Sequence, residues 1–264
     1  NYEGYEFVNR EEDMGLESLR KAKQMLHPIK MIKKYTIVLN EQSIVQADDN
    51  DLYGIIDLWR NSFKDEDEMS TNFYFINRYQ KENTYLLKND HHIASMLQIV
   101  PYTILLDNKE EPVYFILGVA TDKNYQRQGM MKKLMNHVLG LPKYQNAKIM
   151  LQAYHPELYY QFGFNEDYFH KITKVDIQSY SAPSKLRVIE NYNYNKLVNL
   201  YNCFCENFNG YRKRDIEYYN NYLIPRCMAF KEEIKVFYHD IKAVGYVIYS
   251  EDATTIKISE IIYL

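Results

Sequence analysis

One short segment of the chain combines residues that are suited to holding an anion. An apolar, strand-like run over residues 113–120 leads into a polar turn at residues 126–129, and a helical pattern begins at once. Such a turn leaves several backbone N–H groups free at the positive end of a helix dipole, which favours a pyrophosphate. Gly129 lets the backbone approach a ligand closely, and Arg127 and Lys132 add positive charge. The segment predicts a phosphate-binding loop.

The turn and its flanks resemble the GCN5-related N-acetyltransferase (GNAT) superfamily. The superfamily signature, Gln/Arg-x-x-Gly-x-Gly/Ala, is met by Gln126, Arg127, Gln128, Gly129 and Met130. Met131, in the last position, departs from the signature, where a small residue is usual. Bulky residues at that place are familiar in the Eis-like branch (enhanced intracellular survival proteins), and the preceding Gly-Val-Ala-Thr also matches that branch.

The resemblance implies acetyl-CoA as co-substrate and assigns roles to this segment. In such enzymes the backbone of the strand end, here Val119, Ala120 and Thr121, hydrogen-bonds the pantetheine arm. The loop residues that wrap the pyrophosphate correspond to Arg127, Gln128, Gly129, Met130, Met131 and Lys132. The alternative is a strand-turn-helix crossover that merely has a glycine in its turn.

A second segment offers a proton donor. Residues 156–164 read Pro-Glu-Leu-Tyr-Tyr-Gln-Phe-Gly-Phe, and GNAT enzymes commonly carry Tyr-x-x-x-Gly-Phe after a short helix. Counting back four from Gly163 gives Tyr159 and not Tyr160. The resemblance implies that Tyr159 is the general acid for the departing thiolate, to which a phenol of pKa about 10 can donate. The chain holds 27 tyrosines, so a packing tyrosine is the alternative.

The remaining candidates for chemistry are weaker, and no residue stands out as a general base. His91 and His92 read as a solvated pair without further metal ligands, and His155 reads as a turn residue. The basic residues at 211–214 are expected to be exposed charge at a helix start. We predict no metal site. The odd number of cysteines fits a reducing cytoplasm, with packing roles for Cys203, Cys205 and Cys227.

Charge and hydropathy exclude other classes of protein. The formal net charge of -3 argues against a nucleic-acid binder. No apolar run approaches the roughly 20 residues that cross a bilayer, and no signal peptide is recognisable. We therefore expect a cytoplasmic protein, and a homo-oligomer remains open.

The elements around the two segments predict an α+β fold. The order is a strand, two helices, three or four strands in an antiparallel meander, a helix, a strand, a short helix from Pro156 and a strand after Gly163. Apolar spacing places the first helix at residues 52–63 behind capping carboxylates at Asp48 and Asp49. The expected strands are residues 35–39, 84–87, 92–100, 103–106, 113–120 and 148–152.

Three regions are expected along the chain. Residues 1–35 form a helical arm, similar over about 30 residues to the tail of the phosphatidylglycerol lysyltransferase C-terminal domain family. Residues 36–180 form the GNAT domain. Residues 185–264 repeat two helices and three strands, and they resemble the first half of the second GNAT-like domain of Eis-like proteins, without a cofactor loop.

Two functions compete at this stage. The first is an acetyl-CoA-dependent N-acetyltransferase, in which a primary amine of a small molecule or protein attacks directly and the Val119 amide polarises the carbonyl. The second is a non-catalytic GNAT-like module that binds coenzyme A or assembles with a partner. The sequence does not reveal the acceptor, because specificity lies in loops.

Overall fold

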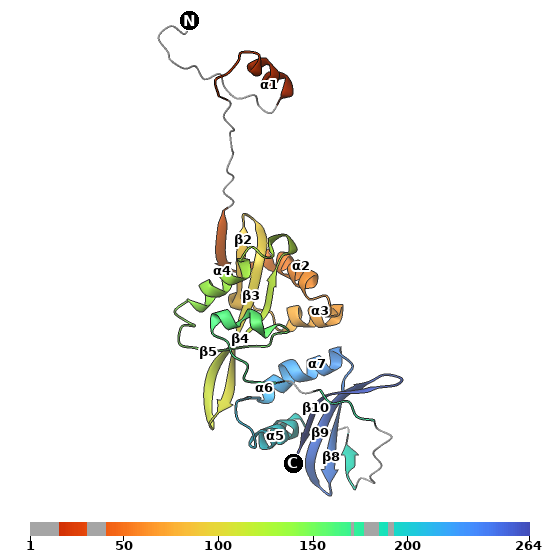
Figure 1. The fold of residues 1–264 in the computed structure, drawn as a ribbon. Coiled ribbons are helices and arrows are strands. Elements are labelled where there is room, and N and C mark those ends of the chain that lie inside the picture. The colour runs from red at the N-terminus through yellow and green to blue at the C-terminus, as the bar shows by residue number, and fades with distance from the viewer. Residues whose placement is uncertain (1–15, 31–40, 170–171, 177–184, 190–192) are drawn as a thin grey trace. The chain divides into compact units, whose positions relative to one another are not determined.

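The computed structural model describes residues 16–30, 41–169, 172–176, 185–189 and 193–264. The chain divides into two compact units, Asn1–Asn40 and Glu41–Leu264 (Figure 1). The first contains helix α1 (Glu17–Gln24). The strand expected at residues 35–39 lies outside the described residues.

The larger unit contains two sheets, of which the first positions the predicted loop. Its strand order is β1-β2-β3-β4-β5, antiparallel except for the parallel β4–β5 pair, and β7 also pairs with β3. The strands are β1 (Gln42–Gln46), β2 (Thr84–Asn89), β3 (His92–Leu106), β4 (Lys109–Thr121), β5 (Lys148–Leu151) and β7 (Tyr211–Arg212). The predicted α+β class, a mostly antiparallel mixed sheet flanked by helices, is confirmed.

Helices cover both faces of this sheet (Figure 1). On one face lie α2 (Leu52–Ser62), which packs Ile55 and Trp59 against the sheet, and α3 (Glu68–Asn77). On the other face α4 (Met130–Leu139) buries its apolar stripe. The short turn η1 (Asp49–Asp51) precedes α2 and begins with a capping box on Asp48, as the capping prediction required. The turn η2 (Lys81–Asn83) leads into β2.

Three local predictions were wrong. The segments expected as separate strands at residues 92–100 and 103–106 form the single strand β3, which runs through Pro101. Pairing with β2 ends at Gln98, so the missing N–H of Pro101 costs no bond to that neighbour. The short helix expected from Pro156 is instead two 3₁₀ turns, η4 (Pro156–Leu158) and η5 (Tyr160–Phe162). No strand follows Gly163 in residues 164–169 or 172–176, where one was expected.

The second sheet has the antiparallel order β10-β9-β8-β6. Its strands are β6 (Arg187–Ile189), β8 (Glu233–His239), β9 (Lys242–Glu251) and β10 (Ile256–Tyr263). Its first helix is α5 (Tyr194–Cys205). Three helical segments then follow one another directly: α6 (Ile216–Tyr218), the π-helical turn η7 (Tyr219–Leu223) and α7 (Ile224–Ala229). Pro225 at the start of α7 cannot donate a backbone bond to the preceding turn, which is wider here.

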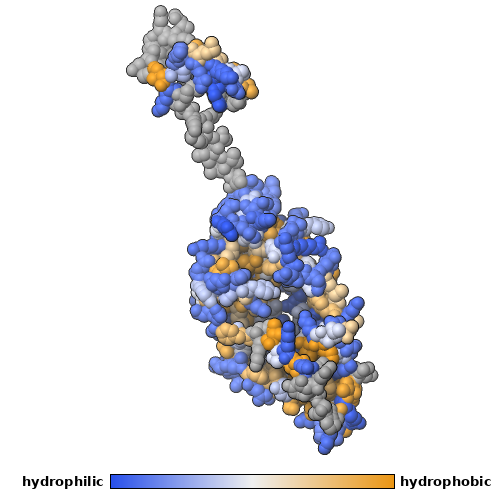
Figure 2. Space-filling view, turned by 45° about the vertical axis from the view of Figure 1, so that its right-hand side comes forward, coloured by the Kyte–Doolittle hydropathy of each residue, from blue (hydrophilic) through white to orange (hydrophobic). Residues whose placement is uncertain are grey.

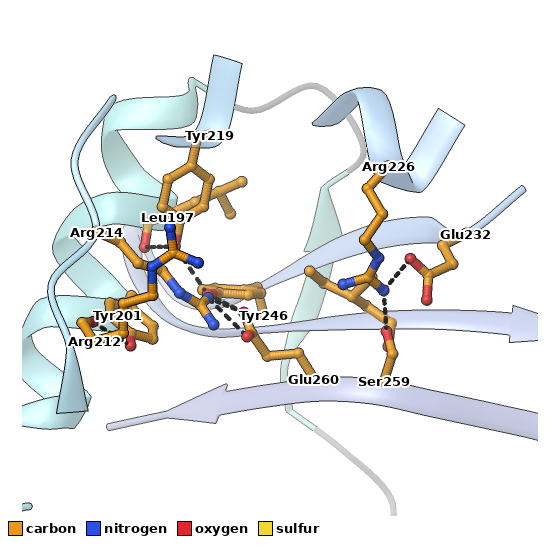
Figure 3. Close-up of polar contacts among 11 residues, drawn as sticks. Leu197, Tyr201, Arg212, Arg214, Tyr219, Arg226, Glu232, Tyr246, Ser259 and Glu260 are labelled. Carbon is orange, nitrogen blue, oxygen red and sulfur yellow. Dashed lines mark hydrogen bonds and ion pairs between the residues drawn. The ribbon is translucent and has the colours of Figure 1, made fainter. Parts of the chain in front are cut away.

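A polar network lies inside this C-terminal half (Figure 3). Arg214 forms an ion pair with Glu260 at 2.7 Å, and the hydroxyl of Tyr246 donates to Glu260 at 2.6 Å. The hydroxyls of Tyr219 and Tyr246 lie 3.1 Å apart. The guanidinium of Arg214 also stacks over the ring of Tyr201, 4.0 Å from its centroid. The network therefore ties the helices to the strands through charges that are paired.

The two halves of the larger unit are joined through the β3–β4 hairpin. Ile104 and Leu105 of β3 pair with β7, and Gly210 N–H donates to the Leu105 carbonyl at 2.8 Å. Asn209 exchanges two hydrogen bonds with Asp107, at 2.7 and 2.8 Å.

Figure 2 shows hydrophobic surface gathered over the C-terminal half, where exposed apolar residues lie along β10. None of the described helices is both long and apolar enough to cross a membrane.

Candidate active site

The edge of β4 opens where the predicted pantetheine strand lies. β5 pairs with β4 only from Val113 to Ile116, whereas β4 continues to Thr121. The backbone of residues 117–121 therefore has no β5 neighbour on that edge. A register shift between Leu117 and Ala120 marks a bulge in β4, where Gly118 has φ +61°. Bulges re-aim a strand and are frequent beside active sites.

Trp59 of α2 packs against this bulge. A Cβ atom on Gly118 would lie 2.5 Å from Cζ3 of Trp59, so only glycine fits both the space and the left-handed backbone. The indole is held in turn by a hydrogen bond from its Nε1 to Glu66 at 2.9 Å and by stacking on Tyr74 at 4.8 Å. The bulge is thus a rigid part of the core.

The loop after β4 begins at Asp122, which caps the turn η3 (Lys123–Tyr125). Its carboxylate accepts from Asn124 N–H at 2.8 Å and contacts Nε2 of His92 at 3.0 Å. Burial alone would raise the pKa of Asp122, but these two hydrogen bonds outweigh it and lower the pKa. His92, predicted as a solvated residue, also stacks on Tyr125, and so it braces the loop.

The turn of residues 126–129 contains two left-handed residues. Arg127 has φ +59° and Gly129 has φ +78°, and such left-handed residues within a turn make concave arrangements of N–H groups. The side chains of Gln126 and Gln128 close the loop on itself through bonds to the carbonyls of Thr121 and Asn124, at 3.3 and 2.8 Å. Their amides therefore shape the loop.

The N-terminus of α4 follows directly. Lys133 N–H donates to the Gly129 carbonyl at 2.9 Å, so the N–H groups of the first helical residues have no acceptor within the helix. A Cβ on Gly129 would meet nothing within 4 Å, which shows open space over this turn. Met130 is buried and Met131 packs against the same core, whereas the side chains of Arg127 and Lys132 are exposed. Met130 can thus offer a ligand only its backbone.

Tyr159 lies between η4 and η5, half-buried in the core on the α4 side of the sheet. Its ring meets Phe164 edge-on at 6.2 Å. Burial raises the pKa of Tyr159 above its usual value of 10, so the phenol keeps its proton at neutral pH. The hydroxyl of neighbouring Tyr160 instead donates to the carboxylate of Glu166. The Tyr159 hydroxyl, by contrast, has no hydrogen bond to another residue that the structure describes.

The other polar candidates from the sequence are His155, possible metal ligands and the three cysteines. His155 is exposed and faces Glu157 at 3.2 Å. Within the described parts of the chain, no group of three His, Cys, Asp or Glu side chains could hold a metal. The cysteines are free thiols; Cys205 and Cys227 are buried, as predicted for packing residues, but Cys203 is exposed.

One cavity was missed by the sequence reasoning. It measures about 260 Å³ and is lined by Tyr74, Asn77, Arg78, Gln80, Val100, Pro101, Tyr102, Leu117 and Arg212. Arg212 belongs to the basic cluster that we expected to be exposed, but it is half-buried, as is Arg214. Both guanidiniums lie over tyrosine rings. The high tyrosine content of the sequence is the signal that could have pointed to this packing.

Comparison with known proteins agrees with this geometry. Residues 43–166 match the family model described as Acetyltransferase (GNAT) domain. The chain has the GNAT fold. None of the curated proteins matches it.

Solved structures with this fold are distant in sequence. A conserved protein of unknown function from Enterococcus faecalis, described as a probable N-acyltransferase, is 17% identical with a TM-score of 0.67 over 86% of this chain. A GCN5-related N-acetyltransferase from Anabaena variabilis is 16% identical, with a TM-score of 0.63 over 85%. Eis1 from Mycobacterium abscessus is 11% identical, with a TM-score of 0.58 over 84%. The chain spans 59% of the length of each, and the likeness shows the shared fold.

Proposed function

We propose that this protein is an acetyl-CoA-dependent N-acetyltransferase that transfers an acetyl group to a primary amine. The observation that carries the proposal is the edge of β4 beyond Ile116, which pairs with none of the described strands and leads through η3 to the turn of residues 126–129 and the N-terminus of α4. Free N–H groups of an extended strand suit an amide-bearing arm, and those at a helix start suit phosphates.

The residues present fit that co-substrate. The turn offers open space over Gly129, free N–H groups at Met130, Met131 and Lys132, and the exposed cations Arg127 and Lys132. Val119, Ala120 and Thr121 offer the strand backbone beside the gap, and Gln126 and Gln128 hold the turn in shape. When bound there, acetyl-CoA would supply the thioester to be attacked.

Tyr159 supplies the proton in this proposal. The amine nitrogen forms the new C–N bond as the C–S bond breaks, and the departing sulfur takes the hydroxyl proton of Tyr159. The proton that the amine loses restores that hydroxyl through solvent. The Val119 N–H, next to the bulge, would donate to the carbonyl oxygen as negative charge develops on it. The raised pKa of Tyr159 supports its protonated role.

The rival function is a non-catalytic module with the same fold. It would bind coenzyme A or a partner and would not need a proton donor next to the gap. Gly129 and a half-buried Tyr159, whose hydroxyl has no hydrogen bond to another described residue, favour the enzyme. We further propose a GNAT domain at residues 36–180 of Eis-like type, a partial second unit at residues 185–264, an arm at residues 1–35 and a cytoplasmic location.

Acetyl-CoA binding can be tested by thermal shift on the full chain. We expect acetyl-CoA to raise the unfolding temperature of the parent, and Gly129→Asp to abolish the shift, because a side chain and a negative charge then occupy the open space over the turn. Asn108→Asp is the matched control, since it adds the same charge at another left-handed turn residue, at the opposite end of β4. A Gly129→Asp protein that binds as tightly as the parent would refute the placement.

The number of sites gives a separate test. The C-terminal half has no strand-to-helix turn like that of residues 126–129 among its described residues. Titration calorimetry is therefore expected to count one acetyl-CoA per chain. A stoichiometry of two would show that residues 185–264 carry a cofactor site of their own.

A further inference from the structure

The cavity of about 260 Å³ borders the proposed acetyl site from the opposite face of the sheet. Its walls come from α3, from β3, from β4 and from β7 of the C-terminal half. Leu117, which lines it, is the first residue of β4 beyond the segment paired with β5, and it directly precedes the bulge at Gly118. A molecule in the cavity would thus lie beside the opening in the sheet where transfer is proposed.

Two arginines give this cavity its charge. Arg78 donates to the Tyr102 hydroxyl at 2.7 Å, and its guanidinium lies 5.9 Å from the centroid of that ring and 4.4 Å from the centroid of Tyr222. Arg212 lies 4.2 Å from the Tyr102 centroid. Burial, with the nearby cations Arg78 and Arg214, lowers the pKa of Arg212 despite the opposing effect of Tyr102 and Tyr218.

Neither of these arginines has an acidic partner in the described part of the chain. Two other half-buried arginines of the C-terminal half differ, since Arg214 pairs with Glu260 and Arg226 pairs with Glu232 (Figure 3). Half-buried guanidiniums without a carboxylate are costly unless a ligand supplies the negative charge. Arg78 and Arg212 therefore form a positively charged pair facing a cavity.

The lining fits a small acid better than a large one. A volume of about 260 Å³ is slightly below that of typical drug-sized sites, which begin at about 300 Å³. The planar fork of arginine matches the two oxygens of a carboxylate. Tyr74 and Tyr102 add apolar ring surface for a short side chain, and Asn77 and Gln80 add neutral polar groups.

We propose that this cavity binds the acetyl acceptor and that the acceptor is a small amine carrying a carboxylate, which Arg78 and Arg212 hold while the amine points toward the bulge. The proposal rests on the acetyltransferase function proposed above. It also gives the C-terminal half a role, because β7 delivers Arg212 and is fixed to β3 by backbone pairing and by the Asp107–Asn209 bonds.

The test compares amine acceptors that carry a carboxylate, a neutral ester or a phosphate. The full chain is assayed with acetyl-CoA and either a mixture of the standard amino acids, the same mixture as methyl esters, or phosphoethanolamine; N-acetylated products are identified by mass spectrometry. We expect the free acids to be acetylated with kcat/KM at least about tenfold above the esters, the range of a hydrogen bond to a charged group. Products only from phosphoethanolamine would overturn the carboxylate assignment.

Variants of the two arginines test whether these residues cause the preference for free acids over esters. Arg212→Gln and Arg78→Gln should each raise KM for the acids by about tenfold or more and leave the esters almost unchanged. Lys213→Gln is the matched control, because it removes the same charge from an adjacent, exposed residue that pairs with Glu110. Retention of the preference in both arginine variants would overturn the proposal.

The outcomes separate this proposal from the one on which it rests. A thermal shift with acetyl-CoA is recorded on the same samples. If acetyl-CoA binds but no amino acid is acetylated, or the esters react as well as the acids, the carboxylate proposal fails and the acetyl-CoA site stands. If acetyl-CoA does not bind at all, both proposals fail.

Discussion

The loop before α4 and the inside of the C-terminal half contain similar polar groups that are arranged in opposite ways. In the loop, left-handed residues precede a helix start whose first N–H groups have no acceptor within the helix, and open space lies over Gly129. In the C-terminal half, the charge of Arg214 meets Glu260, and the hydroxyls of Tyr219 and Tyr246 complete a chain of hydrogen bonds to the same carboxylate. The first arrangement leaves its partners to be supplied from outside, and the second supplies its own.

The two arginines of one short segment show the same contrast side by side. Arg212 and Arg214 are separated by one residue, and both stack on tyrosine rings. Arg214 points to Glu260, whereas Arg212 points to the cavity beside Tyr102. Identical side chains two residues apart therefore serve stability in one case and, in our proposal, binding in the other. The comparison predicts which substitutions change turnover and which change folding.

The largest expected effect is on turnover at Tyr159. Tyr159→Phe removes the proposed acid and keeps the ring, so turnover should fall about 10²–10⁴-fold while acetyl-CoA affinity stays nearly intact. Because burial raises the pKa of Tyr159, its proton should be retained to a higher pH than that of an exposed tyrosine, and the loss of rate from this group should set in at correspondingly higher pH. Single-turnover rates recorded as the pH rises from about 7 to above 10 measure both effects.

Tyr160→Phe is the matched control for this prediction. It removes the neighbouring hydroxyl, which is bound to the carboxylate of Glu166. We expect its rate to stay within about twofold of the parent, because that hydroxyl takes no part in the proposed proton transfer. A Tyr159→Phe protein that is equally active would remove Tyr159 from the mechanism.

The second prediction concerns folding and not turnover. Glu260→Gln leaves the Arg214 charge without its counter-ion; their side chains are only 17% and 16% exposed. Breaking such a pair is expected to lower the free energy of unfolding by about 3 kcal/mol. Denaturant unfolding of the full chain measures this loss. Glu233→Gln, on an exposed carboxylate that accepts from Tyr249, should change stability little, and an equal loss in both variants would contradict the contrast.

The sequence predicted the parts of the site that depend on local pattern. The order of strand, turn and helix around Gly129, the fold class and the capping of α2 follow from periodicity and turn residues, which act over a few positions. The exposure assigned to Arg212 was wrong because its burial depends on pairing between β7 and β3, about 100 positions apart. Local pattern did not reveal that Pro101 continues a strand, because that depends on where β2 ends.

The smallest expected effect is the difference in stability loss between alanine variants of the two left-handed glycines of the proposed acetyl-CoA site. In Gly118→Ala the new Cβ would lie 2.5 Å from Trp59, and the left-handed backbone adds strain of about 1–2 kcal/mol to an overpacking cost of similar size. Gly129→Ala has the same backbone strain without the clash, since nothing lies within 4 Å of its Cβ. The free energy of unfolding should therefore fall by about 2–4 kcal/mol in the first variant and by about 1–2 kcal/mol in the second. Acetyl-CoA should bind more weakly to the second, because its methyl group occupies the space over the turn. Denaturant unfolding and calorimetric titration of both variants decide the point: equal losses of stability would mean that Trp59 does not hold the bulge, and unchanged affinity in Gly129→Ala would mean that the phosphates lie elsewhere.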